Sequence, residues 1–129
     1  QKIASSSNFL KEWNTPEKAE RQWGHWNDLA ESDKFKVKLL TVNPGKSLSM
    51  QRHAHRNEHW LVIQGCGEVS DGIYNRRLLV GTSTNILIGE WHQLYNIDDV
   101  PLIIIEIQTG NILSEDDIER KFTNLPGVE

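Results

Sequence analysis

Apolar and polar residues alternate in several short stretches of the chain. Residues 35–42 alternate well enough to predict a β-strand, which the turn pair Pro44-Gly45 ends. The same pattern predicts further short strands over residues 48–55, 60–63, 78–80, 84–88, 91–96 and 102–108. Glycines punctuate the series, and Asp71-Gly72 predicts a hairpin turn. Many short strands separated by turn signals indicate an all-β sandwich or barrel.

The two ends of the chain depart from this strand pattern. Residues 16–21 are helix formers or charged, which predicts a short helix or arm. Residues 114–122 predict a short C-terminal helix, because Ser114 can cap it, acidic residues fill its first turn and basic residues its last. We therefore expect an N-terminal arm over residues 1–20, one folded domain over 21–122 and a tail over 123–129.

Composition narrows the class of protein. A chain of 129 residues with 37% hydrophobic and 25% charged residues suits one soluble globular domain. A formal net charge of −4 provides no basic field for nucleic acid, so we expect no nucleic-acid partner. The longest apolar run, residues 102–105, is far shorter than the ~20 residues of a membrane span. The single cysteine, Cys66, has no partner for an internal disulfide, which favours a cytoplasmic location.

Candidate chemistry is concentrated in residues 51–60 and at His92, which together hold four of the five histidines. Side chains two apart in a strand share a face, so Gln51, His53 and His55 are expected to point the same way. A lone strand histidine is usually solvated or hydrogen-bonded in the core and binds no metal. Several histidines clustered in two short segments make metal binding the better interpretation. Imidazole nitrogen and carboxylate oxygen suit Zn²⁺, Mn²⁺, Fe²⁺ or Ni²⁺. The segment has no cysteine thiolate, so it does not resemble a closed structural zinc site. The residue types favour an open metal site.

The spacing of these residues resembles the two sequence motifs of the cupin family. The first motif runs Gly, five residues, His-x-His, three or four residues, Glu, six residues, Gly. It matches at Gly45, Gln51, His53, Glu58 and Gly65, with Gln51 in place of the first histidine. The second motif matches at Gly81, Gly89, His92 and Asn96, with Leu87 in place of a proline. A register that pairs His53 with His55 would leave only two residues before Glu58, fewer than the motif allows.

This resemblance implies a cupin barrel, the double-stranded β-helix or jelly roll. Type I phosphomannose isomerases are cupins that bind zinc through a Gln-x-His pair, a Glu and a distant His. By that resemblance the metal ligands are Gln51, His53, Glu58 and His92, with His55 in reserve. One divalent ion is implied, zinc first, with Mn, Fe, Ni or Co as alternatives.

Over residues 21–122 the chain resembles the phosphomannose isomerase domain of the type II, sugar-nucleotide-forming family. The resemblance rests on Arg21-x-Trp23-Gly24, residues 35–38, His55-Arg56-x-Glu58-His59-Trp60, and residues 101–110 and 115–120. In that family a mannose-1-phosphate guanylyltransferase domain usually comes first, and the chain shows no Gly-rich phosphate loop of that domain. The Tyr-Gly-Arg ending common in the family is also missing.

The resemblance implies a metal-dependent isomerase that interconverts mannose 6-phosphate and fructose 6-phosphate and feeds GDP-mannose and polysaccharide biosynthesis. The reaction needs a group that moves a proton between adjacent carbons and groups that hold the sugar phosphate. The catalytic candidates are His55 and His59, as proton carriers, and Arg56, which can bind phosphate or an enediolate oxygen. The candidates for substrate binding are Arg21, Lys38 and Glu106.

Two other functions stay open at this point. One is a non-catalytic module that binds a sugar or sugar phosphate and acts with a separate nucleotidyltransferase. The other is a different cupin enzyme, such as a metal-dependent dioxygenase, which would more often carry His-x-His, so Gln51 disfavours it. Small cupins commonly pair, so the family implies a homodimer. The expected partners are thus a small sugar phosphate and a second copy of the chain, with no nucleic acid and no membrane.

Overall fold

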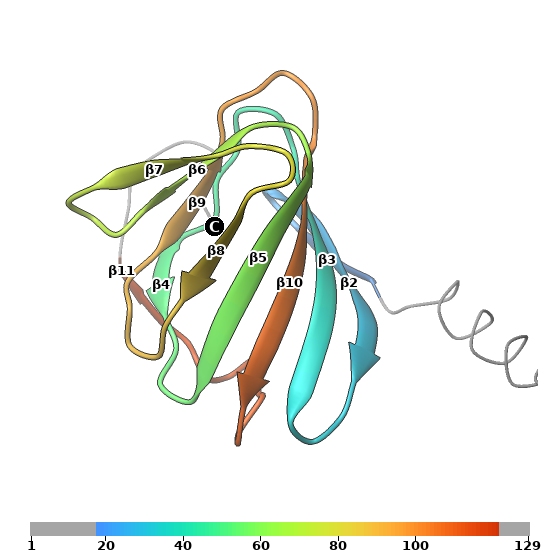
Figure 1. The fold of residues 1–129 in the computed structure, drawn as a ribbon, viewed down its shortest axis with the longest axis vertical. Helices are drawn as coiled ribbons and strands as arrows, with labels where there is room; N and C mark the ends of the chain where they lie inside the picture. Colours follow the sequence, from blue (N-terminus) through green and yellow to red (C-terminus); the bar gives the residue numbers. More distant parts are fainter. Residues whose placement is uncertain (1–17, 122–129) are drawn as a thin grey trace, which may run out of the picture.

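A computed structural model describes residues 18–121, which form eleven β-strands and no helix (Figure 1). The strands are β1 (Lys18–Arg21), β2 (Gly24–Glu31), β3 (Phe35–Val42), β4 (Met50–Arg52), β5 (Arg56–Gln64), β6 (Gly67–Ser70), β7 (Asn75–Leu78), β8 (Ser83–Ile86), β9 (Gln93–Asn96), β10 (Leu102–Gly110) and β11 (Glu119–Lys121). This confirms the all-β class. Nothing within residues 18–121 forms an apolar helix of membrane-spanning length.

The strands form two walls. One wall is a six-stranded sheet of order β1-β2-β3-β10-β5-β8, and the other consists of the three-stranded sheet β7-β6-β9 and the pair β11-β4. Every paired neighbour is antiparallel. Figure 1 shows β5, β10, β3 and β2 on one side, with β4, β9, β6 and β7 on the other. The isolated bridge Gln51↔His92 joins the β4 and β9 segments of the second wall.

The inward-facing side chains of the large sheet are apolar at one end of the strands and polar at the other. The apolar ones include Val42 on β3, Val62 on β5, and Leu102 and Ile104 on β10, all at most 2% exposed. The polar ones are Lys38 on β3, Arg56 and Glu58 on β5, and Glu106 and Gln108 on β10, all buried as well. The register pairs Leu102 with Val42, Glu106 with Lys38 and Gln108 with Glu58. One end of the barrel therefore holds the apolar core, and the other end holds a buried polar site.

Two glycines explain local turns and close approaches. Gly24 has a φ of +149°, and a Cβ built there would lie 1.9 Å from the backbone oxygen of Thr41, so only glycine lets β2 begin this close to β3. Gly72 has a φ of +99° in the turn between β6 and β7. The Asp71 carboxylate accepts the backbone N–H groups of Ile73 and Tyr74 in this turn. The predicted hairpin turn is confirmed.

The strand predictions vary in accuracy. Residues 35–42 form β3 as predicted, whereas the strand expected over 48–55 shortens to β4, and β2 and β6 were not predicted. Residues 18–20, which the sequence assigns to the arm, pair with β2 as most of β1. The rest of the arm, residues 1–17, and the end of the chain, residues 122–129, lie outside the described residues.

The predicted C-terminal helix over residues 114–122 is wrong. The chain instead makes a turn, in which the Asp117 N–H donates to the Ser114 carbonyl (3.1 Å) and the Ser114 hydroxyl accepts the Asp116 N–H (3.1 Å). Residues 119–121 then continue as β11, paired with β4. Glu115 and Asp117 thus bind partners far away in the sequence, and these contacts replace the helix that the local pattern favours.

Candidate metal centre and substrate pocket

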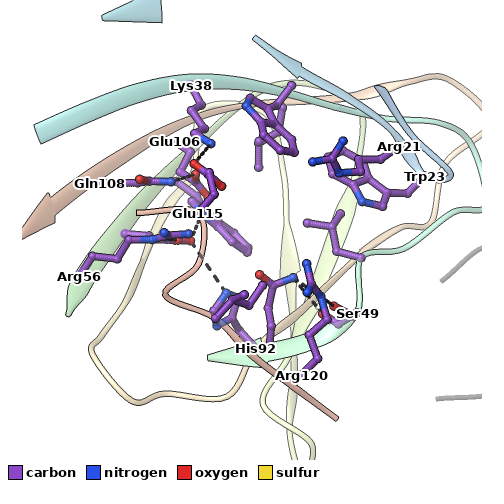
Figure 2. A pocket seen from close by; sticks show the side chains of 17 residues that line it. Arg21, Trp23, Lys38, Ser49, Arg56, His92, Glu106, Gln108, Glu115 and Arg120 are labelled. Atoms are coloured by element: carbon purple, nitrogen blue, oxygen red, sulfur yellow. Dashed lines mark hydrogen bonds and ion pairs between the residues drawn. The ribbon is translucent and has the colours of Figure 1, made fainter. Parts of the chain in front are cut away.

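The buried polar end of the barrel opens into a pocket (Figure 2). The empty space between its lining residues amounts to about 710 Å³, with the open mouth included. Its lining consists of Arg21, Trp23, Trp26, Lys38, Leu40, Leu48, Ser49, Gln51, Arg56, Glu58, Trp60, His92, Glu106, Gln108, Glu115, Ile118 and Arg120. Both walls contribute, so the antiparallel register gathers these residues from distant parts of the chain.

Three of the four predicted metal ligands converge. His53, Glu58 and His92 are all buried, and one ligand atom from each lies within 4.8 Å of the others. His53 Nε2 is 3.2 Å from Glu58 Oε2, and His92 Nε2 is 3.9 Å from Glu58 Oε1. Metal–ligand bonds of ~2.0–2.1 Å in a tetrahedron separate neighbouring ligand atoms by roughly 3.3 Å. The donor set therefore fits one divalent cation in both chemistry and spacing.

His53 and His92 both direct an unprotonated nitrogen, Nε2, toward the cluster. His53 Nδ1 lies 2.7 Å from the Asp117 carbonyl and His92 Nδ1 lies 3.0 Å from the Glu90 carbonyl. A carbonyl can only accept, so each Nδ1 carries the hydrogen and each Nε2 presents its lone pair to the cluster. Burial lowers the pKa of His53 to about 4, with the charge of Arg56 adding to the effect, and burial also lowers the pKa of His92. Both rings are thus kept neutral, which is the form that binds a metal.

The fourth predicted ligand, Gln51, lies beside this cluster. Its backbone exchanges two hydrogen bonds of 2.9 Å with His92, and its side chain lines the pocket. The amide Nε2 donates to the Ser49 carbonyl (3.2 Å), so Oε1 is the atom that Gln51 can offer to a cation. The structure thereby brings Gln51 to the edge of the three-residue cluster.

The expectation that His55 shares a face with Gln51 and His53 is wrong. Strand β4 ends at Arg52, and the chain turns before β5, so strand alternation does not extend to His55. The Asp117 carboxylate fixes this turn by accepting the backbone N–H groups of Ala54 (2.8 Å) and His55 (2.9 Å). The His55 side chain is exposed and does not line the pocket.

Of the predicted catalytic residues, only Arg56 lies in the pocket. Its Nε donates to Glu58 Oε2 (2.8 Å), and at 6% exposure it makes a buried ion pair rather than a surface one. His59 lies on the opposite face of β5, where its Nδ1 is 2.5 Å from Asn85 Oδ1 on β8. The alternation of β5 directs Arg56 and Glu58 inward and His59 outward.

Glu106 is a buried pocket carboxyl outside the metal cluster. It accepts hydrogen bonds from Trp60 Nε1 (3.0 Å) and from Gln108 Nε2 (2.8 Å). Burial, followed by the negative charge of Glu58, raises the pKa of Glu106 to about 7. The neighbouring Gln108 Oε1 is buried and has no hydrogen-bond donor within residues 18–121. This corner can therefore accept a further polar hydrogen from a ligand.

Arg21 and Lys38, the other two predicted substrate-binding residues, both line the pocket. Lys38 Nζ lies 4.1 Å from the centre of the Trp26 ring, and Arg21 Cζ lies 4.4 Å from it, which are cation–π distances. Lys38 is 3% exposed and pairs with Glu115 (2.5 Å) and Asp28 (3.8 Å). Figure 2 shows Lys38 and Glu115 on one side of the pocket and Arg21 on the other.

Comparison with known proteins places this site in a family. The chain matches the family described as "Mannose-6-phosphate isomerase C-terminal" over residues 9–123. It belongs to this family. Xanthan biosynthesis protein XanB of Xanthomonas campestris pv. campestris is 44% identical over 103 residues, 80% of this chain and 22% of XanB. A mannose-1-phosphate guanylyltransferase of Klebsiella pneumoniae is 38% identical over 125 residues, 93% of this chain and 26% of that protein.

Solved structures agree with this assignment at the level of the fold. A Klebsiella pneumoniae protein with a double-stranded β-helix domain superposes with a TM-score of 0.68 at 18% identity, over 88% of this chain and 95% of that one. The fold of this mannose-6-phosphate isomerase C-terminal domain is thus the predicted cupin barrel. The curated relatives are much longer, since the chain spans about a quarter of their length or less.

Sequence reasoning missed several residues of the site. Gln108 lies two positions after Glu106 on one strand and so shares its face, but the sequence does not show whether that face lines a pocket or meets solvent. The predicted helix concealed the roles of Glu115, Asp117 and Arg120, because a helix would turn them to solvent. Only their register with β4 and their contacts with β3 and the β4–β5 turn reveal that they complete the site.

Proposed function

We propose that this domain is a metal-dependent aldose–ketose isomerase that interconverts mannose 6-phosphate and fructose 6-phosphate. The observation that supports this most is that Glu58 and His92 of the three-residue cluster line one pocket together with Glu106, a separate buried carboxyl. Membership of the mannose-6-phosphate isomerase C-terminal family fits this chemistry. Relatives named for xanthan biosynthesis and for mannose-1-phosphate guanylyltransferase suggest that the product supports polysaccharide formation.

His53, Glu58 and His92 would hold the metal, with the Gln51 Oε1 as a fourth donor. When bound, a divalent ion stabilises negative charge on the sugar oxygens of C1 and C2. Arg56 keeps the Glu58 carboxylate in place through the 2.8 Å bond from its Nε. The carboxylate is thereby oriented before the substrate arrives.

Proton transfer is best assigned to Glu106. The reaction removes a proton from C2 of the aldose and returns one to C1, while the hydroxyl proton moves from O2 to O1. Of the buried pocket carboxyls, Glu58 belongs to the metal cluster, and the remaining one is Glu106. His55 and His59 point away from the pocket, so their predicted role as proton carriers finds no support in their positions.

A coupled assay that follows fructose 6-phosphate formation from mannose 6-phosphate tests the proposal. Turnover should be lost after chelation and restored by a divalent metal, with Zn²⁺, Mn²⁺, Fe²⁺, Ni²⁺ and Co²⁺ compared. Turnover that is unchanged in metal-stripped protein would contradict the mechanism. Metal-loaded protein that binds mannose 6-phosphate without turning it over would instead support a sugar-phosphate-binding module.

A further inference from the structure

Arg120 is an exposed cation that lines the pocket. It lies on β11 directly opposite Gln51 of β4. Its Nε donates to the Ser49 hydroxyl (3.2 Å), and Ser49 also lines the pocket. Figure 2 shows Arg120 and Ser49 next to His92 along one side of the pocket. The bond to Ser49 places the guanidinium beside the start of β4, on a different side of the pocket from Glu106 (Figure 2).

The other cations contributed by the central strands of the pocket are already neutralised. Lys38 pairs with Glu115 and Asp28, and Arg56 pairs with Glu58. Both are buried, and each would have to give up a carboxylate to bind an incoming anion. Arg120, in contrast, is exposed and makes no ion pair within residues 18–121. Its charge is therefore available at the mouth of the pocket.

We propose that Arg120, supported by Ser49, is the subsite for the phosphate group of the substrate. A guanidinium offers parallel N–H donors that match phosphate oxygens, and its Nε bond to Ser49 holds it in one orientation. An exposed subsite also leaves part of the phosphate hydrated, which limits the cost of desolvating a dianion. The inference rests on the proposed function only in taking the ligand to be a sugar phosphate.

The positions of the reacting carbons agree with this arrangement. In a hexose 6-phosphate the phosphate lies at the opposite end of the molecule from C1 and C2. The buried cluster and Glu106 would take the C1–C2 end, while the exposed Arg120 takes the other end. The exposed Arg21 also lines the pocket. A ligand without a phosphate would lose the contact with Arg120 alone.

The test compares Arg120→Gln with Arg120→Lys and with Arg52→Gln. Arg52 is a matched control because it is an arginine on the partner strand β4 that pairs with Glu119 and stacks on Trp91 outside the pocket. Each protein is titrated with mannose 6-phosphate, with inorganic phosphate and with mannose. We expect Arg120→Gln to weaken mannose 6-phosphate binding by about 10- to 100-fold, as loss of a charged hydrogen-bond pair does. Arg120→Lys should recover part of that loss, and Arg52→Gln should match the wild type.

The remaining readouts separate a phosphate subsite from a structural role. Arg120→Gln should raise KM with little change in kcat, and its binding of mannose and its metal content should be unchanged. Equal weakening of mannose and mannose 6-phosphate, unchanged affinity for both phosphate ligands, or no phosphate binding by the wild type would each overturn the subsite. Absence of isomerase turnover alongside a selective loss of phosphate binding would refute the proposed function and leave the subsite standing.

Discussion

The side chain of Glu106, on the central strand β10, is bound by two neutral hydrogen-bond donors. Trp60 and Gln108 each donate one hydrogen bond to it, and it forms no ion pair within residues 18–121. In this respect Glu106 differs from Glu58, which forms an ion pair with Arg56, and from Glu115, which forms one with Lys38. A carboxyl that exchanges protons with a substrate needs this freedom, whereas a metal ligand needs the opposite.

Glu106→Gln should therefore lower kcat by about 10²- to 10⁴-fold, the usual contribution of a general acid–base group. The fold should survive, since an amide oxygen still accepts from Trp60. A rotated Gln108 could use its unsatisfied Oε1 to accept the new N–H. Steady-state kinetics with metal-loaded protein measures the effect.

Glu68→Gln is the matched control for that experiment, because Glu68 lies on β6 outside the pocket and bonds to Asn75. This variant should keep the wild-type kcat, and both variants should bind the same amount of metal. A Glu106→Gln protein with a kcat within threefold of the wild type would exclude Glu106 as the proton carrier.

The positions of individual site residues were predictable where the spacing of a sequence motif determines them. The motif register identifies His53, Glu58 and His92 correctly as neighbours, although they come from three different segments. It fails for His55, since side-chain direction beyond the end of a strand depends on the turn that follows. That turn is fixed by Asp117, which lies 62 positions further along the chain. No local pattern could reveal this contact.

At the scale of elements, residues 113–118 do not form the predicted helix. They form a turn that crosses the site, here called the strap. Cations of the large sheet hold it: Lys36 donates to the Leu113 carbonyl (3.4 Å), Arg56 to the Ser114 carbonyl (3.2 Å), and Lys38 pairs with Glu115. Asp117 then binds the β4–β5 turn through its carboxylate, and its carbonyl binds His53. The strap therefore positions His53, one of the three residues proposed to hold the metal.

Asp117→Ala should weaken metal binding by about 10-fold, because the carboxylate that fixes the β4–β5 turn is lost while the backbone carbonyl that bonds His53 remains. The substitution frees the N–H groups of Ala54 and His55, so the turn no longer holds His53 with its Nε2 toward the cluster. Competition with a chromophoric chelator measures the metal affinity, and circular dichroism of metal-free protein checks that the fold is kept.

Asp116→Ala is the matched control for Asp117→Ala. Asp116 is the exposed neighbour in the same turn, and among the described contacts only its backbone forms hydrogen bonds. Metal affinity should stay at the wild-type value in this variant. Equal affinities in the two variants would show that the Asp117 carboxylate does not position His53.

The elements themselves were predictable to different degrees. Residues 35–42 and 102–108 alternate clearly, because one face of each strand is buried and the other is not, and both form strands. Strand β2 was missed because its burial is intermediate over Trp26 and most of its length, so no strong alternation marks it. The acidic residues 115–117 satisfy a helix start and a turn equally well, and only their distant partners select the turn.

For the whole molecule, the barrel separates stability from chemistry. Apolar residues fill one end, and the buried charges lie together at the other, where each is paired or hydrogen-bonded. The cupin resemblance predicted this fold correctly. The homodimer and the cytoplasmic location stay predictions. The chain spans 22% of XanB, so the isomerase proposal concerns only the region that the two proteins share.

Titration of metal-free protein with a divalent metal in a calorimeter tests the central claim most directly, because the proposed isomerase activity depends on a cation held by His53, Glu58 and His92. The wild type should bind one ion per chain, and Glu58→Gln and His92→Ala should each abolish or greatly weaken that binding while remaining folded. A wild-type chain with no saturable metal site, or variants that bind metal as tightly as the wild type, would contradict the account.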